Sequence, residues 1–184
     1  MIPETEATGL LREMYEQAQT PHGTVDNVMK VHSLRPHTMQ GHVALYRSVL
    51  HHPDITLPVW FLEVVASYTS IKNNCDYSLA HHFHNARQLI ADSKRADRIY
   101  AALVNSRPED EFSGKELLLL QYADKLTLRV GEMEKNDVDV LRKAGCSDGE
   151  ILEVNQVVAY FNYSNRLLNG LGVTTEGDAV GYYK

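Results

Sequence analysis

Apolar residues recur at every third or fourth position along most of the chain, which is the spacing of one face of an α-helix. The clearest stripe follows Pro58 and consists of Phe61, Val64, Val65 and Tyr68. No segment alternates apolar and polar residues over the length of a strand, and no Asn-Gly or Asp-Gly turn joins two such runs. The pattern therefore predicts an all-α fold, a compact bundle of many helices.

Capping and breaking residues set the expected helix boundaries. Helices are predicted over residues ~8–18, from Pro36, from Pro58, from Cys75, from Asp92 or Ser93, and over 137–144. Two capping boxes, Ser113 with Glu116 and Ser147 with Glu150, predict helices that end near residues 129 and 168. No repeat or low-complexity linker divides the chain, so residues 1–184 are predicted to form one domain. The glycine-punctuated residues 174–184 are expected to form a flexible tail.

Charge and cysteine content narrow the class of protein. Eighteen basic against 24 acidic residues give a net charge of −6, which argues against binding to nucleic acid or to an anionic membrane. The longest apolar run, residues 99–104, is far shorter than the ~20 residues of a membrane span, and the N-terminus is acidic where a secretory leader is basic. Two cysteines provide no disulfide framework. We therefore expect a cytoplasmic protein.

Reactive side chains are densest at the start of one predicted helix, in the run Cys75-Asp76-Tyr77-Ser78-Leu79-Ala80-His81-His82. If Asn74 caps this helix, Cys75 lies in the first turn, where free N–H groups and the helix dipole favour the thiolate. Ser78 and His82 follow at three and seven residues, so all three project from one face. Glu63 lies on the preceding helix, and in a helical hairpin it could reach His82 and hold its tautomer.

Structural roles are the alternative for the same residues. A cysteine in a helical protein is often a small buried apolar residue, and Cys146, in a predicted turn, is interpreted in that way. Glu63 could instead form an ion pair with Arg87 or Arg166. His81 and His84 fall on other faces of the helix and are expected at the surface or in hydrogen bonds. Histidine spacings of one, two and three residues are unlike those of helical zinc sites, so no metal or other cofactor is predicted.

The pattern Glu63, eleven residues, Cys75-x-x-Ser78, x-x-x, His82 resembles the Glu…Cys-x-x-Cys-x-x-x-His signature of the alkylhydroperoxidase D / carboxymuconolactone decarboxylase family. The peroxidase-related branch is the most similar. Further matching segments are Ser33-Leu34-Arg35-Pro36, Ala144-Gly145, Ser147-Asp148, Tyr160-Phe161-Asn162, Asn165-Arg166-Leu167 and Gly170-Leu171-Gly172-Val173. The resemblance covers about residues 25–173.

This resemblance implies a homo-oligomer of all-helical subunits and a peroxidase that reduces hydroperoxides through paired cysteines. The chain departs from the family at Ser78, which replaces the attacking cysteine and cannot form a sulfenic acid. In the first hypothesis, Cys75 is the single redox thiol of a peroxidase, assisted by His82 and Glu63, with a small hydroperoxide as substrate and an external thiol as reductant. In the second, Glu63, His82 and Ser78 perform acid–base chemistry on a small carbonyl or lactone substrate. In the third, the chain is a non-catalytic oligomeric scaffold.

Apolar segments provide a separate argument for oligomerisation. Residues 58–61 and the predicted helix over 117–128 contain more apolar surface than one small bundle is expected to cover. The second segment could equally lie in the core.

Overall fold

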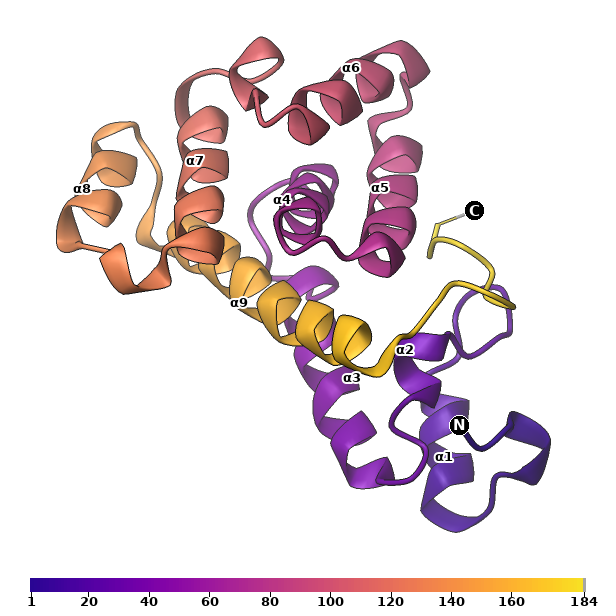
Figure 1. Cartoon of the computed structure of the whole chain (residues 1–184). Helices are drawn as coiled ribbons and strands as arrows, with labels where there is room; N and C mark the ends of the chain where they lie inside the picture. Colours follow the sequence, from indigo (N-terminus) through magenta and orange to yellow (C-terminus); the bar gives the residue numbers. More distant parts are fainter. Residues whose placement is uncertain (184) are drawn as a thin grey trace.

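The computed structural model describes residues 1–183, and among these it contains helices and no strand (Figure 1). The α-helices are α1 (Gly9–Gln17), α2 (Asn27–Lys30), α3 (Pro36–Leu50), α4 (Val59–Lys72), α5 (Asp76–Ile90), α6 (Ser93–Val104), α7 (Gly114–Leu128), α8 (Lys135–Lys143) and α9 (Asp148–Leu171). Short 3₁₀ turns lie at Glu4–Glu6, Pro108–Asp110 and Val130–Glu132. The all-α prediction is confirmed.

Helix α4 is the centre of the fold. It is surrounded by α5, α6, α7 and α9, as Figure 1 shows in a view along its axis. Every residue of 61–70 is buried, Glu63 included. A helix that is apolar almost all round is stable only when neighbours cover every side, and that explains its central position. The large buried side chains around it include Leu50, Ile99, Leu103, Leu119, Leu120 and Phe161.

Helices α4 and α5 form the predicted hairpin. The connecting Asn74 has a left-handed backbone with φ of 51°, a conformation that asparagine tolerates better than most residues. The Cys75 N–H donates to the Ser70 carbonyl at 2.9 Å, and Cys75 is the N-cap of α5. The predicted cap was Asn74, so the helix begins one residue later than expected.

Caps elsewhere agree with the sequence only in part. The box of Ser147 and Glu150 forms at the start of α9 as predicted. Ser113 precedes α7 but its side chain makes no capping hydrogen bond, so the first predicted box is wrong. Helix α8 begins earlier than the predicted 137–144, because Glu134 and Asp137 cap it, and it ends before Gly145.

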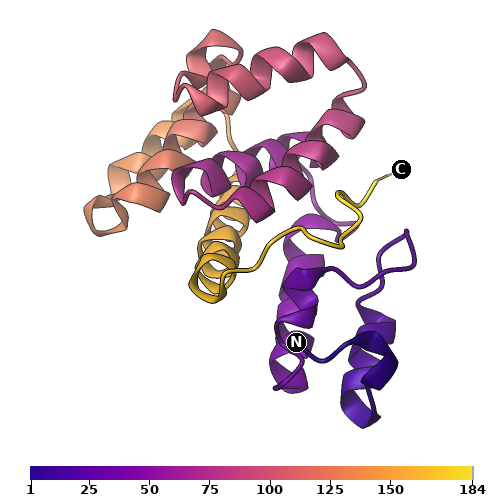
Figure 2. The same ribbon diagram turned by 45° about the vertical axis from the view of Figure 1, so that its right-hand side comes forward.

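A second, smaller core lies beside the first. It joins α1, α2 and α3 through the buried side chains of Ala7, Leu11, Met14, Tyr15, Val25, Met29, Met39 and Val43. In Figure 2, α1 and α3 run side by side below the central helices. A cavity lies at the boundary between the two cores, with Met29 and Val43 of the smaller core and Tyr46 and Tyr160 of the larger one in its wall.

The C-terminal segment after α9 runs back across α2 and α5 (Figures 1 and 2). The Asp178 carboxylate accepts from the Asn27 N–H at 3.0 and 3.1 Å, and the Tyr182 N–H donates to Asn85 Oδ1 at 2.6 Å. We refer to residues 173–183 as the C-terminal strap. This differs from the flexible tail expected over 174–184, whose last residue, Lys184, lies outside the described residues.

The apolar segments considered for oligomerisation pack largely within the chain. Phe61, Leu119 and Leu120 are fully buried, whereas Leu128 is exposed. They therefore supply little argument for self-association, and homo-oligomerisation remains a prediction. Within residues 1–183, none of the helices has the length and apolar character needed to cross a membrane.

Candidate active site

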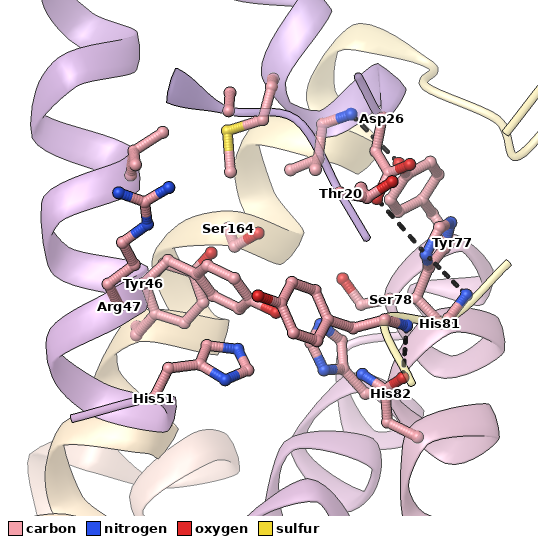
Figure 3. Close-up of a pocket in the computed structure, with 18 of the residues that line it drawn as sticks. Thr20, Asp26, Tyr46, Arg47, His51, Tyr77, Ser78, His81, His82 and Ser164 are labelled. Carbon is pink, nitrogen blue, oxygen red and sulfur yellow. Dashed lines mark hydrogen bonds and ion pairs between the residues drawn. The ribbon is translucent and has the colours of Figure 1, made fainter. Parts of the chain in front are cut away.

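A cavity of about 270 Å³ lies between α3, α5, α9 and the C-terminal strap (Figure 3). Tyr46 and Arg47 of α3 line one side together with His51, the C-cap of that helix, and Tyr77 and His81 of α5 line the other. The remaining wall comes from Ala18, Gln19, Thr20, Asp26, Val28, Met29, Val43, Ser78, His82, Asn85, Tyr160, Ser164, Gly181 and Tyr182. Polar and aromatic groups thus converge on one enclosed space, as in many small-molecule sites.

Glu63 and His82 are joined directly across the α4–α5 hairpin. His82 Nδ1 lies 2.7 Å from Glu63 Oε2, and Asn85 Nδ2 donates to Glu63 Oε1 at 3.1 Å. Glu63 is completely buried, so its carboxylate relies on these two partners. The alternative ion pairs are not formed, because Arg87 pairs with Asp97 and Arg166 bonds to Asn162. The predicted contact between Glu63 and His82 is present.

This contact determines the state of the imidazole that faces the cavity. A carboxylate only accepts hydrogen bonds, so Nδ1 carries the hydrogen of this contact and Nε2 is the nitrogen left for other partners. The ring of Phe161 stands edge-on to that of His82, with centroids 4.5 Å apart, and limits its rotation. The His82 side chain is 12% exposed, and the residue lines the cavity. His82 is therefore oriented as a base toward the cavity.

Ser78 lies one helical turn before His82 and also lines the cavity. The residue is 2% exposed, so it is screened from bulk solvent. Residues four apart lie on the same helix face, which brings the hydroxyl and the imidazole to the same part of the wall.

Cys75 does not belong to that wall. The residue is 1% exposed and packs in an apolar cluster with Tyr77 and Leu168, against Val28 and Val173. Cys75 is therefore buried, as the alternative interpretation of a cysteine in a helical protein expects, because Leu168 of α9 and Val173 of the strap cover this corner. The second thiol, Cys146, is also buried, and burial raises its pKa.

Several residues of the cavity were missed from the sequence. Tyr46 and Tyr160 occupy apolar-stripe positions of α3 and α9, where a tyrosine is easily taken for a core residue. Burial raises the pKa of both hydroxyls, so both are neutral phenols. Tyr182 arrives on the strap and packs on His51, with ring centroids 4.8 Å apart. For His81, the sequence offered one signal, the number of histidines within α5.

Two carboxylates lie near His81 at the strap side of the cavity. Asp26 Oδ2 is 3.9 Å from His81 Nδ1, and Asp178 Oδ2 is 3.7 Å from His81 Nε2. Burial and the charge of Asp178 raise the pKa of Asp26 to about 7. Burial and neighbouring histidines lower the pKa of His81 to about 4, so the ring is neutral, and its Nδ1 accepts the Gly181 N–H at 3.3 Å. His81, expected at the surface or in a hydrogen bond, is buried and hydrogen-bonded.

Among residues 1–183, no group of three or more histidine, cysteine, aspartate or glutamate side chains is placed to hold a metal ion. Asp178 is already bonded to the Asn27 N–H and to the Tyr77 hydroxyl.

Sequence comparisons give no assignment, because no family model matches the chain and no curated protein matches it. Comparison of structures finds clear neighbours. An uncharacterized peroxidase-related protein from Silicibacter sp. TM1040 is similar at a TM-score of 0.79 and 24% identity, over 97% of this chain and 92% of that chain.

Two further neighbours extend the comparison. An alkylhydroperoxidase AhpD core, an uncharacterized peroxidase-related protein from Ralstonia eutropha JMP134, has a TM-score of 0.79 and 21% identity over 96% of this chain and 92% of that chain. The debrominase Bmp8 has a TM-score of 0.73 and 17% identity over 96% of this chain and 90% of that chain. The resemblance to the alkylhydroperoxidase D-like family is thus confirmed for the fold.

Proposed function

We propose that this chain, which has the alkylhydroperoxidase D-like fold, is an acid–base enzyme that acts on a small ester or lactone through Glu63, His82 and Ser78. One observation supports this choice above the others. The hydrogen-bonded pair of Glu63 and His82 opens onto a cavity that Ser78 lines and Cys75 does not. A hydrogen-bonded carboxylate and imidazole beside a hydroxyl favour proton transfer over thiol chemistry.

Each of the three residues has a defined role in the proposal. His82 Nε2 takes the proton of the Ser78 hydroxyl while the Ser78 oxygen attacks the carbonyl carbon. Glu63 holds the ring and stabilises the imidazolium that forms. His82 then returns the proton to the leaving oxygen, and a water molecule activated by the same ring releases the acyl group.

We assign to Tyr46 the role of stabilising the negative charge that develops on the carbonyl oxygen of the substrate. It lines the cavity, and its ring centroid is 6.3 Å from that of His82. Because burial raises its pKa, Tyr46 keeps its proton and can donate a hydrogen bond to an oxyanion.

The size of the cavity limits the substrate. A volume of about 270 Å³ suits a compact molecule such as a single ring. A variant of the debrominase Bmp8 in complex with 2,3,4-tribromopyrrole, with a TM-score of 0.69 to this chain, offers a parallel for a small ring compound in this fold.

The proposal is tested with the chromogenic ester 4-nitrophenyl acetate and the lactone dihydrocoumarin. We expect Ser78→Ala and His82→Gln each to lower kcat/KM by about 10²- to 10⁴-fold, the usual contribution of such groups. Cys75→Ala serves as the matched control and is expected to keep the activity. Turnover that survives Ser78→Ala and disappears in Cys75→Ala would contradict the assignment.

A thiol peroxidase built on Cys75 is the second candidate. Its support is the peroxidase-related naming of the neighbours and the position of Cys75 at the start of α5. The sulfur is buried, so peroxide would reach it only after local opening of the strap. Peroxide consumption with an added dithiol, abolished in Cys75→Ala but not in Ser78→Ala, would identify this activity.

A further inference from the structure

A continuous chain of hydrogen bonds leads from the cavity wall to the surface. The Tyr160 hydroxyl lies 2.7 Å from His42 Nε2, and His42 Nδ1 lies 3.0 Å from His32 Nε2. His32 Nδ1 in turn lies 2.7 Å from the Thr38 hydroxyl. Tyr160, His42 and His32 are buried, whereas Thr38 is exposed on the first turns of α3. The catalytic groups proposed above take no part in this chain.

The proton positions along the chain follow from its outer end. The Thr38 hydroxyl has one hydrogen, which it donates to the Arg35 carbonyl at 2.8 Å, since a carbonyl can only accept. Thr38 must therefore accept from His32 Nδ1–H. A neutral His32 then accepts on Nε2 from His42 Nδ1–H.

The inner end of the chain follows in the same way. His42 Nε2 has no hydrogen and accepts the Tyr160 O–H. Burial lowers the pKa of His32, and burial together with the neighbouring His32 lowers the pKa of His42 to about 3, so both rings are neutral. Every donor in the chain thus points away from the cavity, and the Tyr160 oxygen offers only lone pairs to it.

We propose that Tyr160, His42, His32 and Thr38 form a proton relay between the cavity and the surface, with Tyr160 as its inner end. The use of this relay in catalysis rests on the proposed function, because the proposed reaction must release the proton that the relay carries. It also assigns a preference to the ligand, which should carry a hydroxyl or N–H donor where it meets Tyr160.

Proton passage through the relay is balanced at each step. A proton from the cavity binds the Tyr160 oxygen as the Tyr160 hydrogen moves to His42 Nε2. The His42 Nδ1 hydrogen moves to His32 Nε2, and the His32 Nδ1 hydrogen moves to Thr38. The original Thr38 hydrogen turns from the Arg35 carbonyl to bulk water and leaves, so one proton enters and one departs.

Passage also inverts the chain, because both rings now carry hydrogen on Nε2. Only a proton that travels inward restores the starting state. Because His82 returns the serine proton to the leaving oxygen, the one proton that the proposed hydrolysis leaves in the cavity is that of the acid product, and an inward proton resets the relay before it exports the next.

A first test reads the tautomers and does not depend on any enzyme activity. In the full chain with ¹⁵N-labelled histidine, long-range ¹H–¹⁵N spectra should find His32 and His42 neutral with hydrogen on Nδ1. The relay is wrong if either ring carries its hydrogen on Nε2 in the resting protein. Thr38→Val removes only the exposed hydroxyl and should release the His32 tautomer, whereas the exposed neighbour variant His37→Ala should not.

A second test measures proton transfer. The hydrolysis rate of 4-nitrophenyl acetate is followed in mixtures of H₂O and D₂O. The wild type should give a curved dependence on deuterium fraction, which indicates several moving protons, and Thr38→Val should give a linear dependence with a severalfold lower rate. An unchanged dependence in Thr38→Val would overturn the relay. Absence of any hydrolysis would count against the proposed function, while the tautomer spectra would still decide the hydrogen-bond chain.

Discussion

Glu63 of α4 holds His82 of α5 by a hydrogen bond of 2.7 Å between Oε2 and Nδ1, and this bond orients the imidazole toward the cavity. The second oxygen of Glu63 accepts from Asn85, whose own carbonyl oxygen accepts from Tyr182 of the strap. The orientation of the ring is thus tied both to the central helix and to the C-terminal segment.

Replacing the Glu63 carboxylate should stop His82 from acting as a base. In Glu63→Gln the side chain keeps its shape but loses its charge, so the His82 tautomer is no longer held and the imidazolium is no longer stabilised. We expect kcat on a small ester to fall by about 10²- to 10⁴-fold, with the helical circular dichroism spectrum unchanged. Glu153→Gln, at a half-buried carboxylate outside the cavity that accepts from Thr56 and Leu57, is the control. Activity within about twofold of wild type would show that Glu63 is not needed to orient His82 and stabilise its imidazolium.

Asp26 should make the stability of the protein depend on pH. Its folded-state pKa of about 7 is above the ordinary value of 3.8, so the folded state holds the proton more tightly than the unfolded state. Stability from this group is therefore full below about pH 4, is lost as the pH rises to about 7, and changes no further above that.

Asp26→Asn removes the loss of stability that comes from ionising this buried carboxyl group. We expect the variant to gain about 1 to 3 kcal/mol on the wild type at pH 8, and a much smaller amount at pH 5. Urea unfolding at the two pH values measures the difference, and Asp54→Asn, at an exposed side chain, provides the control. An equal effect at both pH values would show that Asp26 titrates normally.

Gly181 should be needed for the strap to close. Its φ is +92°, and a Cβ at this position would collide with the ring of His84. Gly177 has a similar φ of +85° but open space around it, so Gly177→Ala carries the backbone strain without the collision. We expect Gly181→Ala to expose residues 173–183 to limited proteolysis more than Gly177→Ala does. Equal cleavage of the two variants would mean that the His84 ring moves aside and that the added Cβ does not displace the strap.

Cys75 should react slowly in the folded protein. With 1% exposure, its thiol meets iodoacetamide only after local opening, so we expect alkylation at pH 7 to be on the order of 100-fold slower than in urea. Mass spectrometry of a Cys146→Ser background isolates the site. Fast alkylation of the native protein would favour the thiol peroxidase, and acceleration by Gly181→Ala would identify the strap as the barrier.

Much of the architecture could be predicted from local patterns. The stripe after Pro58 predicted a helix, and the order of Glu63 and His82 on successive helices suggested a contact across a hairpin, with an ion pair to Arg87 or Arg166 as the alternative. Helical periodicity carries such information because residues three, four and seven apart share a face in any α-helix. The capping box of Ser147 and Glu150 formed for the same reason, since all its atoms lie within one turn.

The exposure of Cys75 and the membership of the cavity depend on segments that are distant in sequence. Leu168 and Val173 bury the sulfur, Asn27 and Asn85 hold the strap, and His42 of α3 meets Tyr160 of α9 across 118 positions. Helix faces and the hairpin that brings Glu63 to His82 could be predicted from the sequence alone, because each depends on short-range geometry. Only the tertiary structure decided which thiol, hydroxyl or imidazole reaches the cavity, because burial depends on what the rest of the chain packs against.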